Sequence, residues 1–229
     1  MVKILDHGYL NIIESWGSDE RIIESARMST DGGFKGWGTP EEPGDEKLLR
    51  YLWTNKHSTP FEMAGMTIEV QAPILVFREW HRHRTQSYNE MSARYIPLPD
   101  LNYVPSIGRL MIDNGKSNKQ AGTVKGPRDL TIEAASAFRN ALIRSYSDQQ
   151  QVYKQALSDG VPKELARAAL PVGRYSRMRA SANLRNWLAF LTLRMHRNAQ
   201  WEIRQYANAV GKLIEEKFPR TWGFFVAGI

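Results

Sequence analysis

The arrangement of apolar and polar residues predicts a small set of strands. Residues 2–14 alternate with the period of a strand or hairpin, and residues 61–72 predict a second strand. Residues 173–182 carry several arginines between small or apolar side chains, which indicates a further strand with one basic face. We therefore expect one modest β-sheet.

Helical periodicity accounts for much of the remaining chain. Ser18 has the hydroxyl of an N-cap, and the acidic Asp19 and Glu20 follow it in the first turn of a helix that would reach about Met28. Proline is tolerated at the first position of a helix, so Pro73 would open another one. The predicted helices cover residues 18–28, 45–57, 73–84, 130–158, 162–170, 183–196 and 199–218.

Two long segments have the composition of loops. Residues 30–44 are rich in Gly and Pro, and residues 96–126 predict a long exposed loop with several prolines. No change of composition separates two domains. We predict a single α+β domain over residues 1–229, with several helices packed on a small, mostly antiparallel sheet.

Composition narrows the range of functions. The chain has 229 residues, of which 42% are hydrophobic, and a formal net charge of +7. This charge favours anionic partners, either nucleic acid or small phosphorylated molecules. The absence of cysteine excludes disulfides, thiolate metal sites and cysteine nucleophiles. We see no signal peptide and no uncharged apolar run near the ~20 residues of a membrane span, so we expect a soluble cytoplasmic protein.

Candidate chemistry is concentrated in residues 82–95, RHRTQSYNEMSARY. Arg82 and Arg84 carry planar donor forks that fit phosphate oxygens in pairs. A solvated basic helix end is the simpler interpretation of these residues alone. Glu90 and Ser92 favour a small ligand instead, because nucleic-acid patches contain little acid and a short hydroxyl suits a phosphate.

The histidines suggest a metal site only weakly. His81 and His83 have a plausible ligand spacing, but Arg82 and Arg84 between and beside them would repel a divalent cation. We therefore expect no metal. His57, taken alone, is better interpreted as a hydrogen-bonded structural histidine.

A second basic group lies nearer the C-terminus. Arg167 interrupts the apolar stretch LARAAL, and Asn183 with Arg185 would open a helix, which is a natural position for an anion. Each arginine alone could equally be a surface residue. Together they suggest an extended anionic ligand, or more than one. The group comprises Arg167, Arg174, Arg177, Arg179, Arg185 and Arg194.

These blocks together resemble a known family. Arg82-His83-Arg84, followed after seven residues by Ser92, looks like the signature of the flavin-dependent thymidylate synthases. Other similar blocks occur in the family's order: HSTPFEM at 57–63, APILVFREWHRHR at 72–84, SYNEMSARY at 87–95, ELARAALP at 164–171 and NAQWEIRQYA at 198–207.

The resemblance implies reductive methylation of dUMP to dTMP. Methylenetetrahydrofolate would supply the carbon, and FAD reduced by NADPH would supply the hydride. It also implies a homotetramer whose active sites combine residues from several subunits. The composition agrees on one point, because a chain without cysteine cannot attack uracil with a thiolate.

The resemblance also assigns candidate roles for dUMP. Arg194 matches the arginine that would stabilise a negatively charged uracil ring, which makes it the candidate catalytic residue. Ser92 is interpreted as a phosphate ligand, since no base and orienting group for a nucleophile are evident. The positions assigned to dUMP are Glu79, Arg82, Glu90, Ser92, Arg94, Arg167 and Arg194.

The positions assigned to FAD are His57, Thr59, Arg82, His83, Arg84, Glu90, Asn183, Arg185 and Asn198. Three residues depart from the family's pattern. Glu79 stands where a glutamine is frequent and would need pairing, for instance with Arg78 or Arg82. Ala189 stands where an asparagine is common, and Asn198 replaces a histidine. A member that binds nucleotide without turnover therefore remains an alternative, as does a basic nucleic-acid-binding protein.

Overall fold

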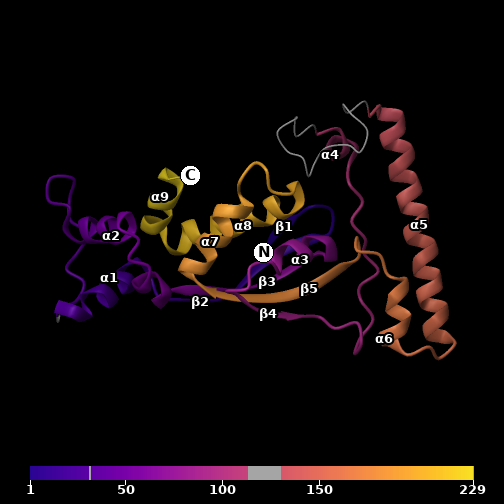
Figure 1. The fold of residues 1–229 in the computed structure, drawn as a ribbon, viewed down its shortest axis with the longest axis horizontal. Helices are drawn as coiled ribbons and strands as arrows, with labels where there is room; N and C mark the ends of the chain where they lie inside the picture. Colours follow the sequence, from indigo (N-terminus) through magenta and orange to yellow (C-terminus); the bar gives the residue numbers. More distant parts are fainter. Residues whose placement is uncertain (31, 113–129, 229) are drawn as a thin grey trace.

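A computed structural model describes residues 1–30, 32–112 and 130–228. Its centre is a five-stranded antiparallel sheet in the order β1-β2-β3-β5-β4 (Figure 1). The strands are β1 (Val2–Ile4), β2 (Gly8–Trp16), β3 (Gly65–Pro73), β4 (Ser87–Glu90) and β5 (Tyr175–Asn183). The antiparallel sheet and the hairpin over residues 2–14 confirm the sequence-based predictions.

Nine α-helices occur in the described part of the chain. They are α1 (Asp19–Arg27), α2 (Gly44–Thr54), α3 (Ile74–Trp80), α4 (Ile107–Met111), α5 (Ile132–Ser158), α6 (Lys163–Ala166), α7 (Leu184–Arg194), α8 (Trp201–Lys217) and α9 (Pro219–Ala227). Short 3-10 turns occur at Met28–Thr30, Thr59–Met63 and Arg167–Ala169. In the part described, no helix is both long and apolar enough to cross a membrane.

The core lies between one face of the sheet and helices α3, α7 and α8 (Figure 1). Alternate residues of the strands, such as Ile68 and Met178, point into it and are buried. Trp80 of α3 stacks on Phe190 of α7, with ring centroids 4.7 Å apart. On the opposite face of the sheet the arginines of β5 are exposed, as the alternation predicted.

Several predicted boundaries are wrong. The segment 61–72 is not one strand, because Thr59–Met63 is a 3-10 turn and β3 begins only at Gly65. The helix predicted over 73–84 is shorter, because Pro73 still pairs in β3 and the helix ends at Trp80. The helix predicted over 162–170 is only the four residues of α6 followed by a 3-10 turn.

Some elements were not predicted at all. Residues 87–90 form β4 instead of a loop, and α9 follows the helix predicted to end at Phe218. The predicted loop 96–126 contains α4, while its residues 113–126 lie outside the described residues.

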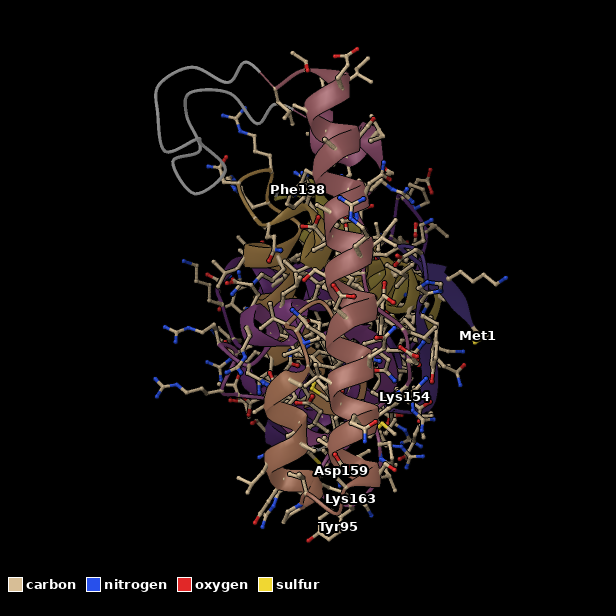
Figure 2. The ribbon with its side chains drawn as sticks, turned by 90° about the vertical axis from the view of Figure 1, so that its right-hand side faces the viewer. Met1, Tyr95, Phe138, Lys154, Asp159 and Lys163 are labelled. Carbon is tan, nitrogen blue, oxygen red and sulfur yellow. The ribbon has the colours of Figure 1, made fainter. Side chains whose placement is uncertain are left out.

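The long helix α5 occurs where it was predicted, but it is sparsely covered. Of its residues, Ala135 and Tyr153 are buried, whereas Phe138 is 52% exposed and Ile132 and Val152 are exposed too. Figure 2 shows α5 running along the outside of the molecule, with Phe138 on it. The apolar residues of this helix therefore pack only in part against the rest of the same chain.

Candidate active site

The segment 81–86 forms a tight turn between α3 and β4, and it carries the Arg82-His83-Arg84 motif. Side chains from two directions fix this turn. The Tyr88 hydroxyl donates to the backbone carbonyl oxygens of Trp80 at 3.2 Å and His83 at 2.6 Å. The Asn186 amide of α7 donates to the carbonyl oxygen of Thr85 at 2.9 Å. The turn that carries the motif is thus held by hydrogen bonds to its backbone, which do not engage the side chains of Arg82 and Arg84.

Arg194, the last residue of α7, reaches back to this turn. Its Nη1 donates to Oε2 of Glu79 at 2.8 Å, and its Nη2 donates to the backbone oxygen of Glu79 at 2.9 Å. Its Nε donates to Nε2 of His83 at 2.8 Å. The candidate catalytic arginine therefore contacts a predicted flavin residue and a predicted dUMP residue. Glu79 pairs with Arg194, and not with Arg78 or Arg82 as the sequence suggested.

His83 is held in its neutral form. Burial and the adjacent positive charge of Arg194 lower the pKa of His83 from 6.5 to about 4, although the Glu79 carboxylate opposes this shift. Its Nε2 accepts a hydrogen bond from Arg194, so the ring proton of the neutral form is on Nδ1. The Phe190 ring packs 4.9 Å away, edge to face.

The other basic residues of the motif point to solvent. Arg82 and Arg84 are exposed, and neither makes a hydrogen bond or ion pair with any described residue. His81 lies away from His83, with its Nε2 3.1 Å from Sδ of Met178. Within the described ranges no three His, Asp or Glu side chains gather as metal ligands would.

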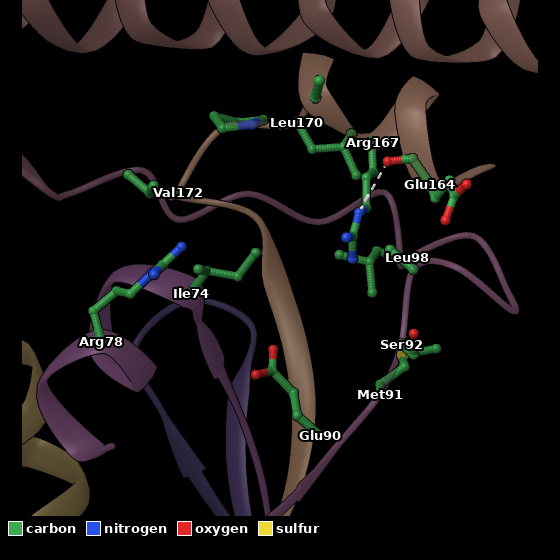
Figure 3. Close-up of a pocket in the computed structure, with 13 residues that line it drawn as sticks. Ile74, Arg78, Glu90, Met91, Ser92, Leu98, Glu164, Arg167, Leu170 and Val172 are labelled. Atoms are coloured by element: carbon green, nitrogen blue, oxygen red, sulfur yellow. Dashed lines mark hydrogen bonds between the residues drawn. The ribbon is translucent and has the colours of Figure 1, made fainter. Parts of the chain in front are cut away.

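A pocket of about 570 Å³ brings together three of the predicted dUMP residues, Glu90, Ser92 and Arg167. We call it the arginine pocket. Figure 3 shows Glu90 at the end of β4, Ser92 in the segment after it and Arg167 beyond α6, on different walls of one hollow. Arg167 Nε donates to the backbone oxygen of Glu164 at 3.2 Å. The pocket can hold an anion between an arginine and a serine hydroxyl.

Arg94 does not line the arginine pocket itself, but it pairs at 3.1 Å with Glu164, which does. Both side chains are more than half exposed, so the pair adds little stability, typically below about 1 kcal/mol. A bound anion can compete for Arg94 at small cost.

The sequence interpretation missed part of this pocket. Arg78 lines it from α3 and has no partner among the described residues (Figure 3). The sequence could have indicated this residue, because Arg78 stands one helical turn before Arg82 and would share its side of the helix. Sequence reasoning gave Arg78 a role only as a possible partner of Glu79. Glu164 also lines the pocket, and only the fold brings it to Arg94.

Three of the nine predicted flavin residues, His57, Thr59 and Arg185, line two further pockets of about 680 and 500 Å³, which share Leu52 and His57. We call them the His57 pockets. Arg185 lines the larger one and Thr59 the smaller one. Ala189, which stands where an asparagine is common in the family, also lines the larger pocket.

The other six predicted flavin residues lie outside these pockets. Arg82, His83 and Arg84 are in the turn after α3, and Glu90 lines the arginine pocket. Asn183 ends β5 and caps α7, since its Oδ1 accepts from the backbone N–H of Asn186 at 2.9 Å. Asn198 lies in the exposed segment between α7 and α8 and lines none of the pockets described above.

The fold and site define an α+β protein that presents available arginines to open pockets, with a neutral histidine beside a partly buried guanidinium. Such an arrangement is suited to anionic small molecules that also carry hydrogen-bonding rings.

Comparisons with known proteins identify the family. Residues 11–220 match the family described as thymidylate synthase complementing protein, Thy1. The flavin-dependent thymidylate synthase of Thermosipho africanus is 38% identical over 98% of this chain and 93% of its own, and that of Thermus thermophilus is 37% identical over 98% and 77%. The chain belongs to this family.

A solved structure with the same fold is the UMP/dUMP methylase PolB from Streptomyces cacaoi, bound with 5-Br dUMP. It is 31% identical in sequence, with a TM-score of 0.83 over 99% of this chain and 97% of its own.

Proposed function

We propose that this protein catalyses the reductive methylation of dUMP to dTMP in the cytoplasm, with methylenetetrahydrofolate as carbon donor and NADPH as the source of reducing equivalents. The observation that carries the proposal is the convergence of Glu90, Ser92 and Arg167 in one pocket. Near-full-length similarity to flavin-dependent thymidylate synthases supports it. The lack of cysteine agrees, because the thiolate route to dTMP is not open to this chain.

In this proposal the arginine pocket holds the phosphate of dUMP. The Ser92 hydroxyl and the Arg167 guanidinium would donate to phosphate oxygens, and Arg94 would exchange Glu164 for the substrate. Arg78 of α3 adds a further available guanidinium to the lining of the same pocket. Arg82 would reach the nucleotide from the turn after α3.

Arg194 would stabilise the negative charge that develops on the uracil ring. A guanidinium fixed before the reaction needs no reorganisation when the charge appears, which is the general basis of electrostatic catalysis. Three hydrogen bonds, to Glu79 and His83, already fix its direction. The neutral state of His83 keeps a second positive charge away from Arg194.

The cofactor of this proposal is FAD. The His57 pockets fit such a group, because Trp53, Phe61 and Phe225 contribute aromatic side chains to the lining of the larger one. Arg185, which pairs with Glu62, would exchange this partner for a diphosphate. When bound, the reduced flavin supplies the hydride. The residues proposed to hold it are His57, Thr59, Arg82, His83, Arg84, Glu90, Asn183, Arg185 and Asn198.

We further propose that the protein is a homotetramer with shared active sites. Arg194 does not line the arginine pocket of its own chain, so one chain offers the two halves of the substrate site in different places. A partner subunit could bring the halves together. The exposed apolar residues of α5 support an assembly, because such surfaces are commonly covered by another chain.

The first test is a visible absorption spectrum of the purified protein, followed by addition of dUMP. We expect a flavin band that shifts when dUMP binds. Arg194→Ala should keep this band but lose about 100-fold or more of the dTMP formation, as is typical when a fixed donor is removed. Arg21→Ala, which changes an exposed arginine of α1, is the control.

Three results would contradict the proposal. A colourless protein that takes up no added FAD would exclude a flavoenzyme. A protein that binds FAD and dUMP but forms no dTMP would be a family member without turnover. Tight binding of nucleic acid that weakens steeply with salt would favour the nucleic-acid alternative.

A further inference from the structure

The contact between Arg194 and Glu79 differs from the other ion pairs near the site. The Arg194 side chain is 16% exposed, whereas Glu79 is 42% exposed. The carboxylate and the backbone oxygen of Glu79 accept from the two terminal nitrogens of the same guanidinium. One residue therefore holds both ends of the arginine fork, while His83 accepts from Nε.

The position of Arg194 explains why it needs such an anchor. It is the last residue of α7, and Glu79 lies in the last turn of α3. Both helices cover the same face of the sheet (Figure 1), so the contact joins their C-terminal ends. A long arginine side chain at a helix end has many accessible rotamers, and ordering it costs entropy unless acceptors hold it.

The charges lead to the same conclusion. His83 is uncharged at neutral pH and accepts a hydrogen bond, but it does not compensate the positive charge of Arg194. Glu79 is the carboxylate that pairs with Arg194 in the part of the chain that the structure describes. As a carboxylate, Glu79 has no proton to donate to a substrate, and its Oε2 already accepts from the guanidinium.

We propose that Glu79 is a positioning residue, which directs the Arg194 guanidinium and does not itself bind dUMP. This inference rests on the proposed function of Arg194 in the reaction. It replaces the substrate-binding role that the family resemblance suggested for residue 79. Because the carboxylate acts through Arg194, its removal should disturb the reaction step more than the binding of dUMP.

The decisive measurement is the titration of His83 by NMR, in protein with nitrogen-labelled histidine, for the wild type, Glu79→Ala and Arg194→Ala. If Glu79 holds Arg194 in place, its loss lets the guanidinium leave, and the pKa of His83 should rise from about 4 toward 6.5, as we also expect in Arg194→Ala. If Arg194 keeps its place without Glu79, removing the negative charge lowers the pKa of His83. The two outcomes have opposite signs, and the second would overturn the proposal.

Kinetics provide an independent readout. We expect Glu79→Ala to lower kcat about 10- to 100-fold, the size of effect that a misplaced catalytic group produces. The KM for dUMP should change less than about twofold, because a positioning residue makes no contact that binds the substrate and the transition state equally. Glu79→Gln, which keeps an acceptor without the charge, should lie between the wild type and Glu79→Ala.

The controls separate this inference from the proposed function. Glu24→Ala removes another exposed ion pair, on α1, and should leave both the His83 titration and kcat unchanged. A raised KM with an unchanged kcat in Glu79→Ala would make Glu79 a substrate ligand. Normal turnover in Arg194→Ala would instead contradict the role of Arg194 in the reaction, whatever the titration of His83 shows.

Discussion

At the scale of single residues, the protonation of His83 links the site to stability. Its pKa is about 4 in the folded protein and 6.5 in an ordinary environment. Because the unfolded chain binds the proton more readily, the unfolded state gains stability as the pH falls. The contribution of neutral His83 is fully present above pH 6.5 and is lost as the pH decreases toward about 4.

We therefore predict that His83→Gln flattens part of the acid dependence of stability. The difference in free energy of unfolding between pH 7 and pH 4.5 should be smaller in this variant than in the wild type, because glutamine does not titrate. Urea unfolding at the two pH values measures it. An identical pH dependence in both proteins would show that His83 is not buried as a neutral ring. His196→Gln, which changes an exposed histidine, is the matched control.

The sequence indicated the identity of many candidate residues but not their partners. The RHR motif, Ser92 and Arg194 are recognisable from local strings. The pairing of Arg194 with Glu79 is not, because 115 residues separate the two and only the packing of α3 and α7 brings them together. Arg94 and Glu164 are 70 residues apart, and their pairing likewise cannot be predicted from local sequence.

At the scale of elements, the turn between α3 and β4 depends on Tyr88. Its hydroxyl donates to the carbonyl oxygen of Trp80, the last residue of α3, and to that of His83 in the turn. Burial raises the pKa of this phenol, which keeps it a donor. The last carbonyls of a helix have no partner within the helix, so an outside donor stabilises its end.

We predict that Tyr88→Phe lowers the free energy of unfolding by about 1–2 kcal/mol, the usual range for losing such donors. FAD affinity should fall as well, because the turn carries the RHR motif. Thermal or urea unfolding and FAD titration measure the two effects. Tyr9→Phe removes a hydroxyl that donates to Glu69 at 2.8 Å on the open face of the sheet. If both variants lose FAD affinity equally, the turn is not the cause.

Two elements were missed for physical reasons that local patterns cannot reveal. The strand β4 is four residues long and mostly polar, and it exists because β5 pairs with it. The helix α9 begins after Phe218 with a cap from the far end of the chain. The carboxylate of Asp19 accepts from the backbone N–H groups of Arg220 at 2.8 Å and Thr221 at 3.2 Å.

At the scale of the whole molecule, α5 is a long helix that one chain covers only sparsely. Its 27 residues span about 40 Å at the rise of an α-helix. The periodicity predicted the helix correctly, but the partner of its apolar residues cannot be read from periodicity. An amphipathic pattern is the same whether the covering surface belongs to the same chain or to another.

We predict that Phe138→Asp weakens the proposed tetramer. A charge placed in a covered apolar contact must be desolvated, which opposes assembly. Gel filtration should show a smaller species, and dTMP formation should fall in parallel, while circular dichroism stays unchanged because Phe138 is exposed in the single chain. Asn140→Asp adds the same charge on another side of α5. A Phe138→Asp protein that remains tetrameric and active would remove this face from the interface.

The strand β5 separates the two kinds of pocket along the chain. Val172, just before it, lines the arginine pocket, and Arg185, just after it, lines the larger His57 pocket. Neighbouring side chains can repack around a substitution within β5, but they cannot compensate for a change in the length of the strand. Inserting one residue would turn Met178 to solvent and Arg179 into the core, and it would rotate the start of α7. We therefore expect β5 to vary by substitution in evolution, while single-residue insertions and deletions within it are excluded because they would change how the two pockets are placed.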